Sequence, residues 1–256
     1  MKDFTIEKYQ QLCNTIIQNG YNIKTLCDYI KSNPKSNTVI LRHDIDSKPN
    51  KALEMAESEY DMEISSTYHF RYKAGIFDRK IIKKIYDMGH EIGYHYETLS
   101  KAHGNFEKAI QLFEFELNEF RKICEINTIS MHGSPLSKYD NRDLWKVYNF
   151  EDYNIIGEAY LSVGTNFCYL SDTGRSWNPK NKIRDFIPKK KERLLINTTD
   201  ELISLIDNKN TDVLYLLAHP GIWAGNSFEW YYSAVENIMG NHMKKLYNFA
   251  NNRGFL

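Results

Sequence analysis

The stretch VILRHDID, residues 39–46, decides how the rest of the chain is interpreted. It begins as an apolar β-strand and ends in two aspartates one residue apart, Asp44 and Asp46. Because side chains alternate faces along a strand, both carboxylates point the same way, with Arg42 behind them and Ile45 opposed. Two like charges this close are costly unless a positive group lies beside them. A divalent metal held by one carboxylate, with the other free as a base, resolves that conflict and makes chemistry possible.

Strand and helix signals alternate on both sides of this stretch. Strands are predicted at 38–46, 63–71, 91–97, 126–132 and 212–218, with strand-like pieces at 157–163 and 167–171. Helices are predicted at 50–61, 77–88, 105–123, 140–147 and 200–207 and from 227 onward, and residues 4–32 as one or two helices. The alternation indicates a parallel sheet, and this many repeats indicates a closed or nearly closed barrel. We expect a single α/β domain over 1–256 with an N-terminal helical extension at 1–36.

Composition excludes several classes of protein. Apolar residues make up 42% and charged residues 26%, which is ordinary for a soluble globular protein. The formal net charge is zero, so the chain lacks the basic character of a nucleic-acid-binding protein. The 18 tyrosines suit a sugar-facing surface, although biased codon usage produces the same excess.

Cysteine spacing and the N-terminus indicate a compartment. The four cysteines show no metal-binding spacing, so we expect buried thiols in a reduced environment. The first residues, MKDFTIEKYQQL, lack the apolar core of a signal peptide, and no run approaches the length of a membrane span. A cytoplasmic protein without a membrane span is therefore expected. Its oligomeric state cannot be read from the sequence.

Polar residues lie at the carboxyl ends of four of the predicted strands, where barrels of this type place their functional groups. They are Asp44 and Asp46, then His95 and Glu97, then His132, and finally His219. A lone histidine is more often a core or surface group than a ligand, and we interpret the remaining five histidines that way. These are His43, which points away from the aspartates, and His69, His90, His103 and His242.

Three segments resemble the polysaccharide deacetylase family, the NodB-homology carbohydrate esterases. HDID (43–46) resembles the first family motif, in which one aspartate is the base and a following one binds metal. GHEIGYH (89–95) resembles the stretch whose final histidine is a metal ligand, and LAHP (217–220) resembles the late motif that supplies a histidine general acid. The resemblance covers residues 38 to 225 and implies a distorted (β/α) barrel of about seven strands.

The chain also departs from the family pattern. The family has a second metal-binding histidine four residues after the first, and here that position is Leu99. The usual Asp-Asp pair is Asp-Ile-Asp, and the arginine-proline motif of the fourth strand is replaced by HGSP (132–135). A third metal ligand must therefore come from elsewhere. Glu97 and His132 are the two candidates, and His103 is a weaker one.

The segment SDTGRSW (171–177) lies near the family's aspartate-containing motif, which orients a catalytic partner. Its Asp172 and Arg175 are candidates for that task or for binding substrate, and Trp177 for stacking on a sugar ring. The alternative is a tight turn with a local ion pair and a buried tryptophan. By contrast, DNRDLW (140–145) is interpreted as the start of a helix, capped by Asp140 or Asn141.

The resemblance implies metal-dependent hydrolysis of an N-acyl group, most simply acetyl, from an amino sugar or a sugar-linked intermediate. In that scheme Asp44 is the base, His219 protonates the leaving amine, and Asp46 and His95 hold the metal with Glu97 or His132. Zn²⁺ is the first candidate, and the mixed O and N ligands would also accept Co²⁺, Ni²⁺ or Fe²⁺.

Two alternatives remain open for the function. One is hydrolysis of another C–N amide, as in a deformylase, and the other is a carbohydrate-binding homologue without catalysis. The sequence has no Gly-rich phosphate loop, so a nucleotide cofactor is not indicated. No G-x-S-x-G elbow surrounds Ser134, so this serine is not indicated as a nucleophile. The missing signal peptide favours a small-molecule or saccharide intermediate, as in surface-polysaccharide biosynthesis, over an assembled polymer.

Overall fold

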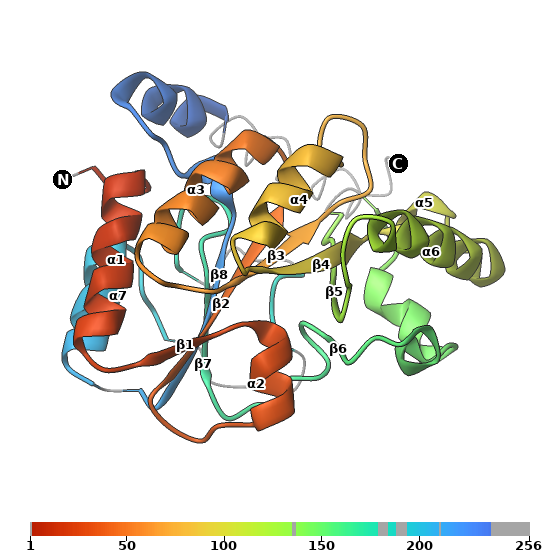
Figure 1. The fold of residues 1–256 in the computed structure, drawn as a ribbon, viewed down its shortest axis with the longest axis horizontal. Helices are drawn as coiled ribbons and strands as arrows, with labels where there is room; N and C mark the ends of the chain where they lie inside the picture. The colour runs from red at the N-terminus through yellow and green to blue at the C-terminus, as the bar shows by residue number, and fades with distance from the viewer. Residues whose placement is uncertain (1, 135–136, 179–183, 188–193, 210, 237–256) are drawn as a thin grey trace, which may run out of the picture.

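The fold is built around one curled, all-parallel sheet. The computed structural model describes residues 2–134, 137–178, 184–187, 194–209 and 211–236. Seven strands follow the order β6-β5-β4-β3-β2-β8-β7, and β1 pairs with β2 outside this order. The strands are β1 (Asn22–Lys24), β2 (Thr38–Ile45), β3 (Thr67–Phe70), β4 (Glu91–Tyr96), β5 (Thr128–Met131), β6 (Gly157–Glu158), β7 (Cys168–Ser171) and β8 (Val213–Ala218). The sheet is open, because the order ends at β6 and β7 within the described residues. The predicted α/β fold with a distorted (β/α) barrel is confirmed (Figure 1).

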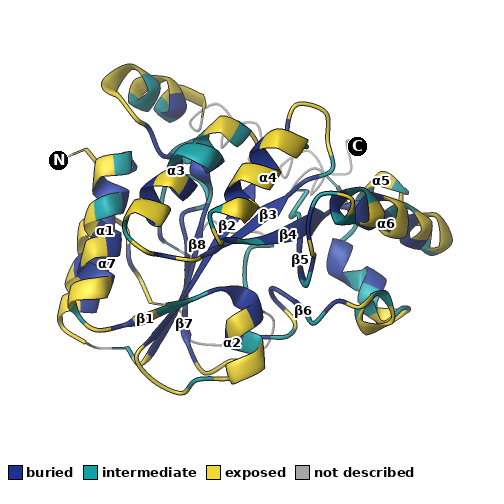
Figure 2. Cartoon of the chain, viewed as in Figure 1, coloured by how far each residue is buried: buried dark blue, intermediate teal, exposed yellow. Residues whose placement is uncertain are grey.

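Helices cover the outside of the sheet. They are α1 (Ile6–Gln18), α2 (Leu26–Ser32), α3 (Pro49–Asp61), α4 (Arg79–Asp87), α5 (Thr98–Lys101), α6 (Phe106–Arg121) and α7 (Thr199–Asp207). Short 3₁₀ helices lie at η1 (Asn141–Lys146), η2 (Phe150–Tyr153) and η4 (Pro220–Ile222), and another helix begins at residue 227. Most of the longer helices begin after a side chain that caps them: Thr5, Thr25, Asp78, Asn105 and Thr198. Figure 2 shows buried strands and exposed outer helix faces.

The elements differ from the sequence prediction mainly in length. Residues 4–32 form two helices, as predicted, but the short strand β1 lies between them. Its three residues, Asn-Ile-Lys, are too few to produce an alternating pattern. The predicted strand 63–71 shortens to Thr67–Phe70, and the strand-like piece at 157–163 shortens to two residues. The helix predicted to continue from 227 is described as far as residue 236, and the rest lies outside the described residues.

Apolar side chains form two buried clusters between the strands and the helices. One includes Phe113 and Tyr94, and the other includes Leu12, Leu41 and Trp223. All four cysteines are buried and lie outside disulfides, which confirms the prediction of buried thiols. Within the described part of the chain, no helix has both the length and the apolar composition needed to cross a membrane.

The interior of the barrel is polar where β2, β3 and β4 meet. Asp44 pairs in register with His69, and His69 pairs with Gly93. A Cβ atom at position 93 would lie 2.2 Å from Cδ2 of His69 and 2.9 Å from the carbonyl oxygen of Thr128. Glycine at position 93 is therefore required for the His69 ring to fit beside Asp44. This is how the sheet places an imidazole deep inside the barrel.

Candidate active site

Four strand ends bring their polar side chains together at one mouth of the barrel. Asp46 follows β2, and its Oδ1 atom lies 3.3 Å from Nε2 of His95 on β4 and 3.5 Å from Nε2 of His132, which follows β5. Its Oδ2 atom lies 3.9 Å from Nε2 of His219, which follows β8. The convergence expected from the sequence is therefore present for these four residues.

The backbone of β5 fixes the orientation of His95. His95 pairs in register with Ser130, and its Nδ1 atom lies 3.0 Å from the Ser130 carbonyl oxygen. A carbonyl oxygen only accepts hydrogen bonds, so Nδ1 carries the proton and Nε2 presents a lone pair toward Asp46. A histidine held in this way is arranged as metal ligands usually are.

His132 is oriented by a carboxylate in the same manner. Its Nδ1 atom lies 2.9 Å from Oε2 of Glu97, so Nε2 faces Asp46. Arg71 donates two hydrogen bonds to Glu97, at 2.9 and 2.7 Å. Burial disfavours the ionised form, but His132 and Arg71 hold the pKa of Glu97 well below its usual range. Of the two candidates for a third ligand, the structure thus places His132 toward Asp46 and Glu97 behind it.

The donors around Asp46 fit a divalent cation. The Asp46 side chain is 39% exposed, yet its Oδ1 atom is buried and accepts no hydrogen bond. Two donors on a tetrahedral zinc, each about 2.0–2.1 Å from the ion, lie about 3.3–3.4 Å apart, close to both Asp46–imidazole distances. Among the described residues, no group of three or more His, Cys, Asp or Glu side chains is placed so that it could hold a metal ion without rearrangement. The fit rests on the Asp46 oxygen and the two lone pairs that face it.

Asp44 is buried and held in its ionised form. Arg42, two residues earlier on β2, donates to its Oδ2 atom at 2.9 Å, and the Ser130 hydroxyl donates at 3.3 Å. Burial alone would raise the pKa of Asp44, but Arg42 and the nearby imidazoles of His95 and His69 lower it to about 2. The Oδ1 atom accepts no hydrogen bond and lies 3.6 Å from Nδ1 of His69. Asp44 is therefore a carboxylate at neutral pH with one free acceptor atom.

His219 forms a dyad with Asp172. Its Nδ1 atom lies 2.6 Å from Oδ1 of Asp172, and its backbone N–H donates to the same carboxylate at 2.9 Å. Trp223 donates its indole N–H to Oδ2 of Asp172 at 2.8 Å, which fixes the carboxylate from the other side. Burial would lower the pKa of His219, but Asp172, with smaller contributions from Asp46 and Asp44, raises it to about 9. At neutral pH this imidazole is protonated.

Of the three residues predicted to bind substrate, Asp172 and Trp177 are fully buried, which favours the alternatives considered for them, an orienting aspartate and a buried tryptophan. Asp172 is completely buried behind His219, so it orients that histidine, which was the other role considered for it. Trp177 is 1% exposed and donates its indole N–H to Thr199, so it has no surface on which a sugar could stack. Arg175 lies over the Phe4 and Trp230 rings and donates to the Trp230 carbonyl.

Two residues near Asp44 were not assigned a role from the sequence. The ring of His69 lies beside Asp44, although a lone histidine is usually structural. Its position depends on the pairing of β3 with β2, which the sequence alone does not give. Strand alternation places Arg42 on the same face as the aspartates. This was the feature of the sequence that could have predicted its ion pair with Asp44.

The remaining histidines in the described residues lie apart from the site. His43 and His90 surround the buried Glu59 on the outer face of β2, as structural groups. His103 is exposed in the turn after α5, and Leu99 is buried in the core. His242 lies outside the described residues. Asp140 caps η1, as expected for a helix start, although this helix is of the 3₁₀ type.

Comparison with known proteins gives structural likenesses only. No family model and no curated protein matches the chain. A CE4 family pseudoenzyme from Bacillus anthracis is 12% identical with a TM-score of 0.48, covering 82% of this chain and 62% of its own. A Streptococcus mutans CE4 esterase is 15% identical with a TM-score of 0.46, covering 89% of this chain and 86% of its own. A family 4 carbohydrate esterase from Bacillus anthracis is 13% identical with a TM-score of 0.41, covering 94% of this chain and 86% of its own.

This chain thus spans 62% of the length of the first of these proteins. At such identities and TM-scores the likeness assigns no role to any side chain of this chain. Roles in a reaction must therefore be argued from the contacts described above. The three proteins belong to the family that the sequence motifs 43–46, 89–95 and 217–220 resemble.

Proposed function

We propose that this protein is a metal-dependent hydrolase that removes an N-acyl group, in the first instance acetyl, from an amino sugar or a sugar-linked intermediate. One observation carries the proposal. The buried Oδ1 atom of Asp46 accepts no hydrogen bond and faces the Nε2 atoms of His95 and His132, between an ionised carboxylate and a protonated histidine. This combination suits hydrolysis of an amide, which needs a base for water and an acid for the amine.

Asp46, His95 and His132 would hold the cation, with Glu97 fixing His132 from behind. Three protein ligands with an open position are typical of a catalytic zinc site, and the same donors accept Co²⁺, Ni²⁺ or Fe²⁺. When bound, the ion would polarise the acyl carbonyl and lower the pKa of water toward about 7. Glu97 is assigned the orienting role because its carboxylate is already bonded to Arg71 and to Nδ1 of His132.

Asp44 would take the proton from the attacking water. Its Oδ2 atom lies 3.8 Å from Nε2 of His95, and its Oδ1 atom accepts no hydrogen bond, so the carboxylate has room to accept the proton. The Arg42 guanidinium, which donates to Oδ2, lies over the Tyr160 ring and donates to the Tyr160 and Tyr215 hydroxyls, so its position is fixed. Arg42 therefore keeps the carboxylate ionised and in one orientation before substrate arrives.

His219 would protonate the departing amine from Nε2. Its Nδ1–H is held by Asp172, so the proton available for transfer is the one on Nε2, which faces the Asp46 side of the site. With a pKa of about 9 the ring is charged at neutral pH. The base and the acid are thus both in the required protonation states at once.

Which acyl group is removed and which molecule carries it must be determined separately. A formyl group or a non-sugar amide would use the same side chains, so only a substrate panel distinguishes the deformylase alternative. We test the proposal by measuring acetate and formate release from N-acetylated and N-formylated hexosamines and from simple amides. The protein is first reconstituted with Zn²⁺, Co²⁺, Ni²⁺ or Fe²⁺.

Asp44→Asn is the decisive variant in this assay. It removes the base and keeps the shape of the side chain, and we expect activity to fall by about 10²–10⁴-fold, the usual contribution of a general base. Asp140→Asn removes a carboxylate outside the site and should leave activity unchanged. Full activity in Asp44→Asn would disprove the assigned base. A protein without stoichiometric transition metal and without turnover would favour the carbohydrate-binding alternative.

A further inference from the structure

Asp44 belongs to a row of polar side chains that runs down the inside of the barrel, away from its mouth. The Oδ1 atom of Asp44 lies 3.6 Å from Nδ1 of His69, and Nε2 of His69 lies 3.2 Å from the Thr128 hydroxyl. That hydroxyl is hydrogen-bonded to Oε1 of Glu91. Glu91 and Thr128 are the first residues of β4 and β5, so the row ends at the opposite end of the barrel. We call these four side chains the interior network.

The contact between Asp44 and His69 requires a proton. In the part of the chain that the structure describes, neither Oδ1 of Asp44 nor Nδ1 of His69 has a hydrogen-bond partner, and both atoms are buried. Their separation exceeds a normal hydrogen bond by about half an ångström, which a small rotation of either side chain removes. Asp44 is ionised, so its oxygen can only accept. The contact is therefore favourable only if Nδ1 of His69 carries a proton, because a lone pair there would leave both buried atoms unsatisfied.

The Thr128 hydroxyl determines which nitrogen of His69 carries that proton. The hydroxyl has one hydrogen and lies between Nε2 of His69 and Oε1 of Glu91. If Glu91 is ionised, the hydroxyl donates to Glu91, the proton of a neutral His69 is on Nε2, and Nδ1 has a lone pair. If Glu91 is protonated on Oε1, Glu91 donates to Thr128, Thr128 donates to Nε2 of His69, and Nδ1 carries the proton. The protonation of Glu91 thus sets what Asp44 meets.

The neighbours of Glu91 leave one place for a proton on its carboxyl group. Its Oε2 atom accepts from the backbone N–H of Cys27 at 3.0 Å and from the Thr67 hydroxyl at 2.8 Å. The Thr67 oxygen accepts from the Leu26 N–H, so the hydrogen of that hydroxyl is available to Glu91. Because Oε2 already accepts two hydrogen bonds, a proton on Glu91 belongs on Oε1, which faces Thr128.

Burial favours the same arrangement. It raises the pKa of Glu91, because the hydrogen bonds that this carboxyl accepts do not compensate for the loss of water. It also lowers the pKa of His69 well below its usual range, although Asp44 lies nearby. A proton shared between Glu91 and His69 therefore stays on the carboxyl group, and the imidazole is neutral.

We propose that Glu91, as a carboxylic acid, fixes His69 in its Nδ1–H tautomer, and that His69 positions Asp44 by donating to its Oδ1 atom. A carboxylate accepts about four hydrogen bonds, and Arg42, Ser130 and His69 supply three, so one site stays open for the proton from water. His69 and Glu91 are positioning residues, because His69 is completely buried and Glu91 lies at the far end of the barrel. This inference rests on the proposed function, in which Asp44 is the base.

The first experiment observes the tautomer and needs neither metal nor substrate. The metal-free protein is labelled with ¹⁵N in its histidine rings, and NMR spectra that correlate the ring nitrogens with the carbon-bound ring protons show which nitrogen is protonated. The His69 signals are identified by their loss in His69→Asn. We expect a neutral ring with its proton on Nδ1. A proton on Nε2 alone, or on both nitrogens, would overturn the proposal.

Glu91→Gln tests the source of the tautomer. The amide oxygen must take the place of Oε2 to accept from Cys27 and Thr67, so the amide nitrogen faces Thr128 and donates as the carboxylic acid does. We therefore expect His69 to keep its Nδ1–H tautomer in this variant. An amide cannot imitate an ionised Glu91, so a change of tautomer in Glu91→Gln would contradict the assigned proton.

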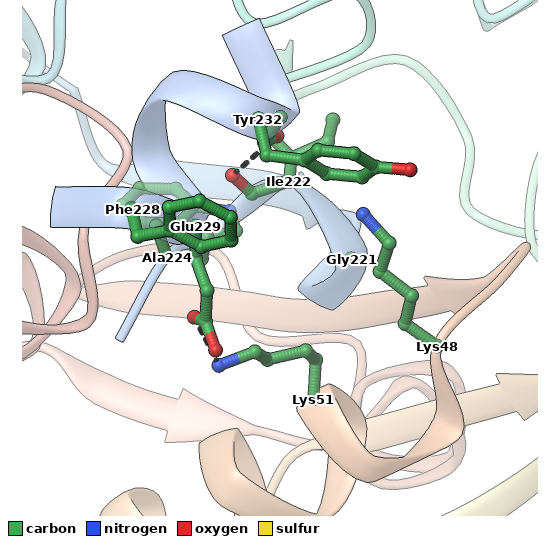
Figure 3. A pocket seen from close by; sticks show the side chains of 10 residues that line it. Lys48, Lys51, Gly221, Ile222, Ala224, Phe228, Glu229 and Tyr232 are labelled. Carbon is green, nitrogen blue, oxygen red and sulfur yellow. Dashed lines mark hydrogen bonds and ion pairs between the residues drawn. The ribbon is translucent and has the colours of Figure 1, made fainter. Parts of the chain in front are cut away.

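Glu229→Gln is the matched control. Glu229 pairs with Lys51 at 2.6 Å beside a hollow of about 190 Å³, shown in Figure 3, and none of the residues that line this hollow belongs to the interior network. The substitution exchanges a carboxylate for an amide, as Glu91→Gln does, and should leave kcat and the His69 signals as in wild type. Equal shifts of the His69 signals in Glu91→Gln and Glu229→Gln would remove the evidence for a specific contact and refute the role of Glu91.

The kinetic experiment compares two substitutions of His69 in the metal-loaded protein. His69→Leu removes the donor, and kcat should fall about tenfold, the effect of one hydrogen bond to a charged group. KM should stay within about twofold, because no hydrogen bond to substrate is lost with a completely buried side chain. His69→Asn has an amide N–H as many bonds from Cα as Nδ1 is, and should recover most of kcat. Equal kcat in His69→Leu and His69→Asn would overturn the positioning role.

The two measurements separate this inference from the proposed function. If metal-loaded protein hydrolyses no N-acylated substrate, the proposed function fails, and the His69 tautomer still decides whether the interior network is correct. If acetate is released and His69→Leu keeps the kcat of wild type, the positioning role is wrong and the proposed function stands. If His69→Leu does not fold, the NMR spectra of wild type and Glu91→Gln decide the outcome.

Discussion

Replacing Asp172 with asparagine removes the charge that keeps His219 protonated. The pKa of His219 is raised from 6.5 to about 9, mainly by the adjacent carboxylate against the effect of burial. This difference corresponds to about 3 kcal/mol of preference for the charged imidazole. Asp46 and Asp44, which also raise the pKa of His219, would remain in Asp172→Asn. We therefore expect the pKa of His219 to fall by about two units, and not as far as burial alone would lower it.

The assay is the pH dependence of kcat/KM. The alkaline limb of this profile reports the group that must be protonated, which is His219 in our scheme. We expect the limb to move about two pH units toward acid in Asp172→Asn, with about a tenfold loss at a pH midway between the two limbs. A bound cation would lower the pKa of His219 by a similar amount in wild type and in Asp172→Asn. The quantity to compare is therefore the difference between the two alkaline limbs.

Unfolding of the metal-free protein gives an independent measurement with a defined sign. Because the folded-state pKa lies above the unfolded one, the stability from this pair is fully present below about pH 6.5 and is lost as pH rises through about 9. The difference in unfolding free energy between wild type and Asp172→Asn should therefore be largest below pH 6.5 and shrink above it. Asp140→Asn, which breaks a pair with Arg142, should leave the alkaline limb in place. An unchanged limb in folded Asp172→Asn would refute the assignment of His219 as the acid.

Two further changes test the metal ligands and the packing of the barrel. His132→Ala should weaken Zn²⁺ binding by about 10²-fold or more, and Glu97→Gln by about 10–100-fold as an orienting residue; both are measured by competition with a chelating dye. His103→Asn, at an exposed residue with positive φ, is the matched control, and equal affinity in His132→Ala and this control would exclude His132 as a ligand. Gly93→Ala should cost about 1–3 kcal/mol of unfolding free energy in urea, because its methyl group would overlap His69. The second substitution His69→Ala should recover part of that loss, and a fully stable Gly93→Ala protein would contradict the packing.

The parts of the fold that depend on local pattern could be predicted from the sequence. Alternating strands and helices gave the parallel barrel, and β2 matched its predicted bounds within one residue because its apolar run is continuous. The three-residue strand β1 was missed, since so short a segment carries no periodicity. Likewise, the side chains that meet at the mouth were predictable, because carboxyl ends of parallel strands lie at one edge of the sheet.

What the sequence could not provide was register and depth. His69 is beside Asp44 because β3 pairs with β2 at that residue, and strand pairing is a tertiary property. For the same reason the sequence could not decide between a sugar-stacking and a buried Trp177, and the structure packs it against Phe4 and Trp223 in the core. Nor could spacing alone decide between Glu97 and His132. That distinction depends on which of the two side chains faces Asp46. Arg71, which is far from both in the sequence, pairs with the Glu97 carboxylate and holds it away from Asp46.

Two of the three departures from the family pattern, at Leu99 and at His132, can be explained together by the same register. In the family a second histidine follows the first by four residues, and here that residue is Leu99, which packs in the core. His95 pairs with Ser130 on the neighbouring strand, and His132 lies two residues beyond Ser130, at the same edge of the sheet. Under the proposed function, the ligand that the family places in the turn after β4 would be supplied here by the end of β5, with Asp46 and His95 in the same positions. Loss of one motif histidine therefore does not by itself imply loss of the metal, because a parallel barrel offers an equivalent position on the adjacent strand.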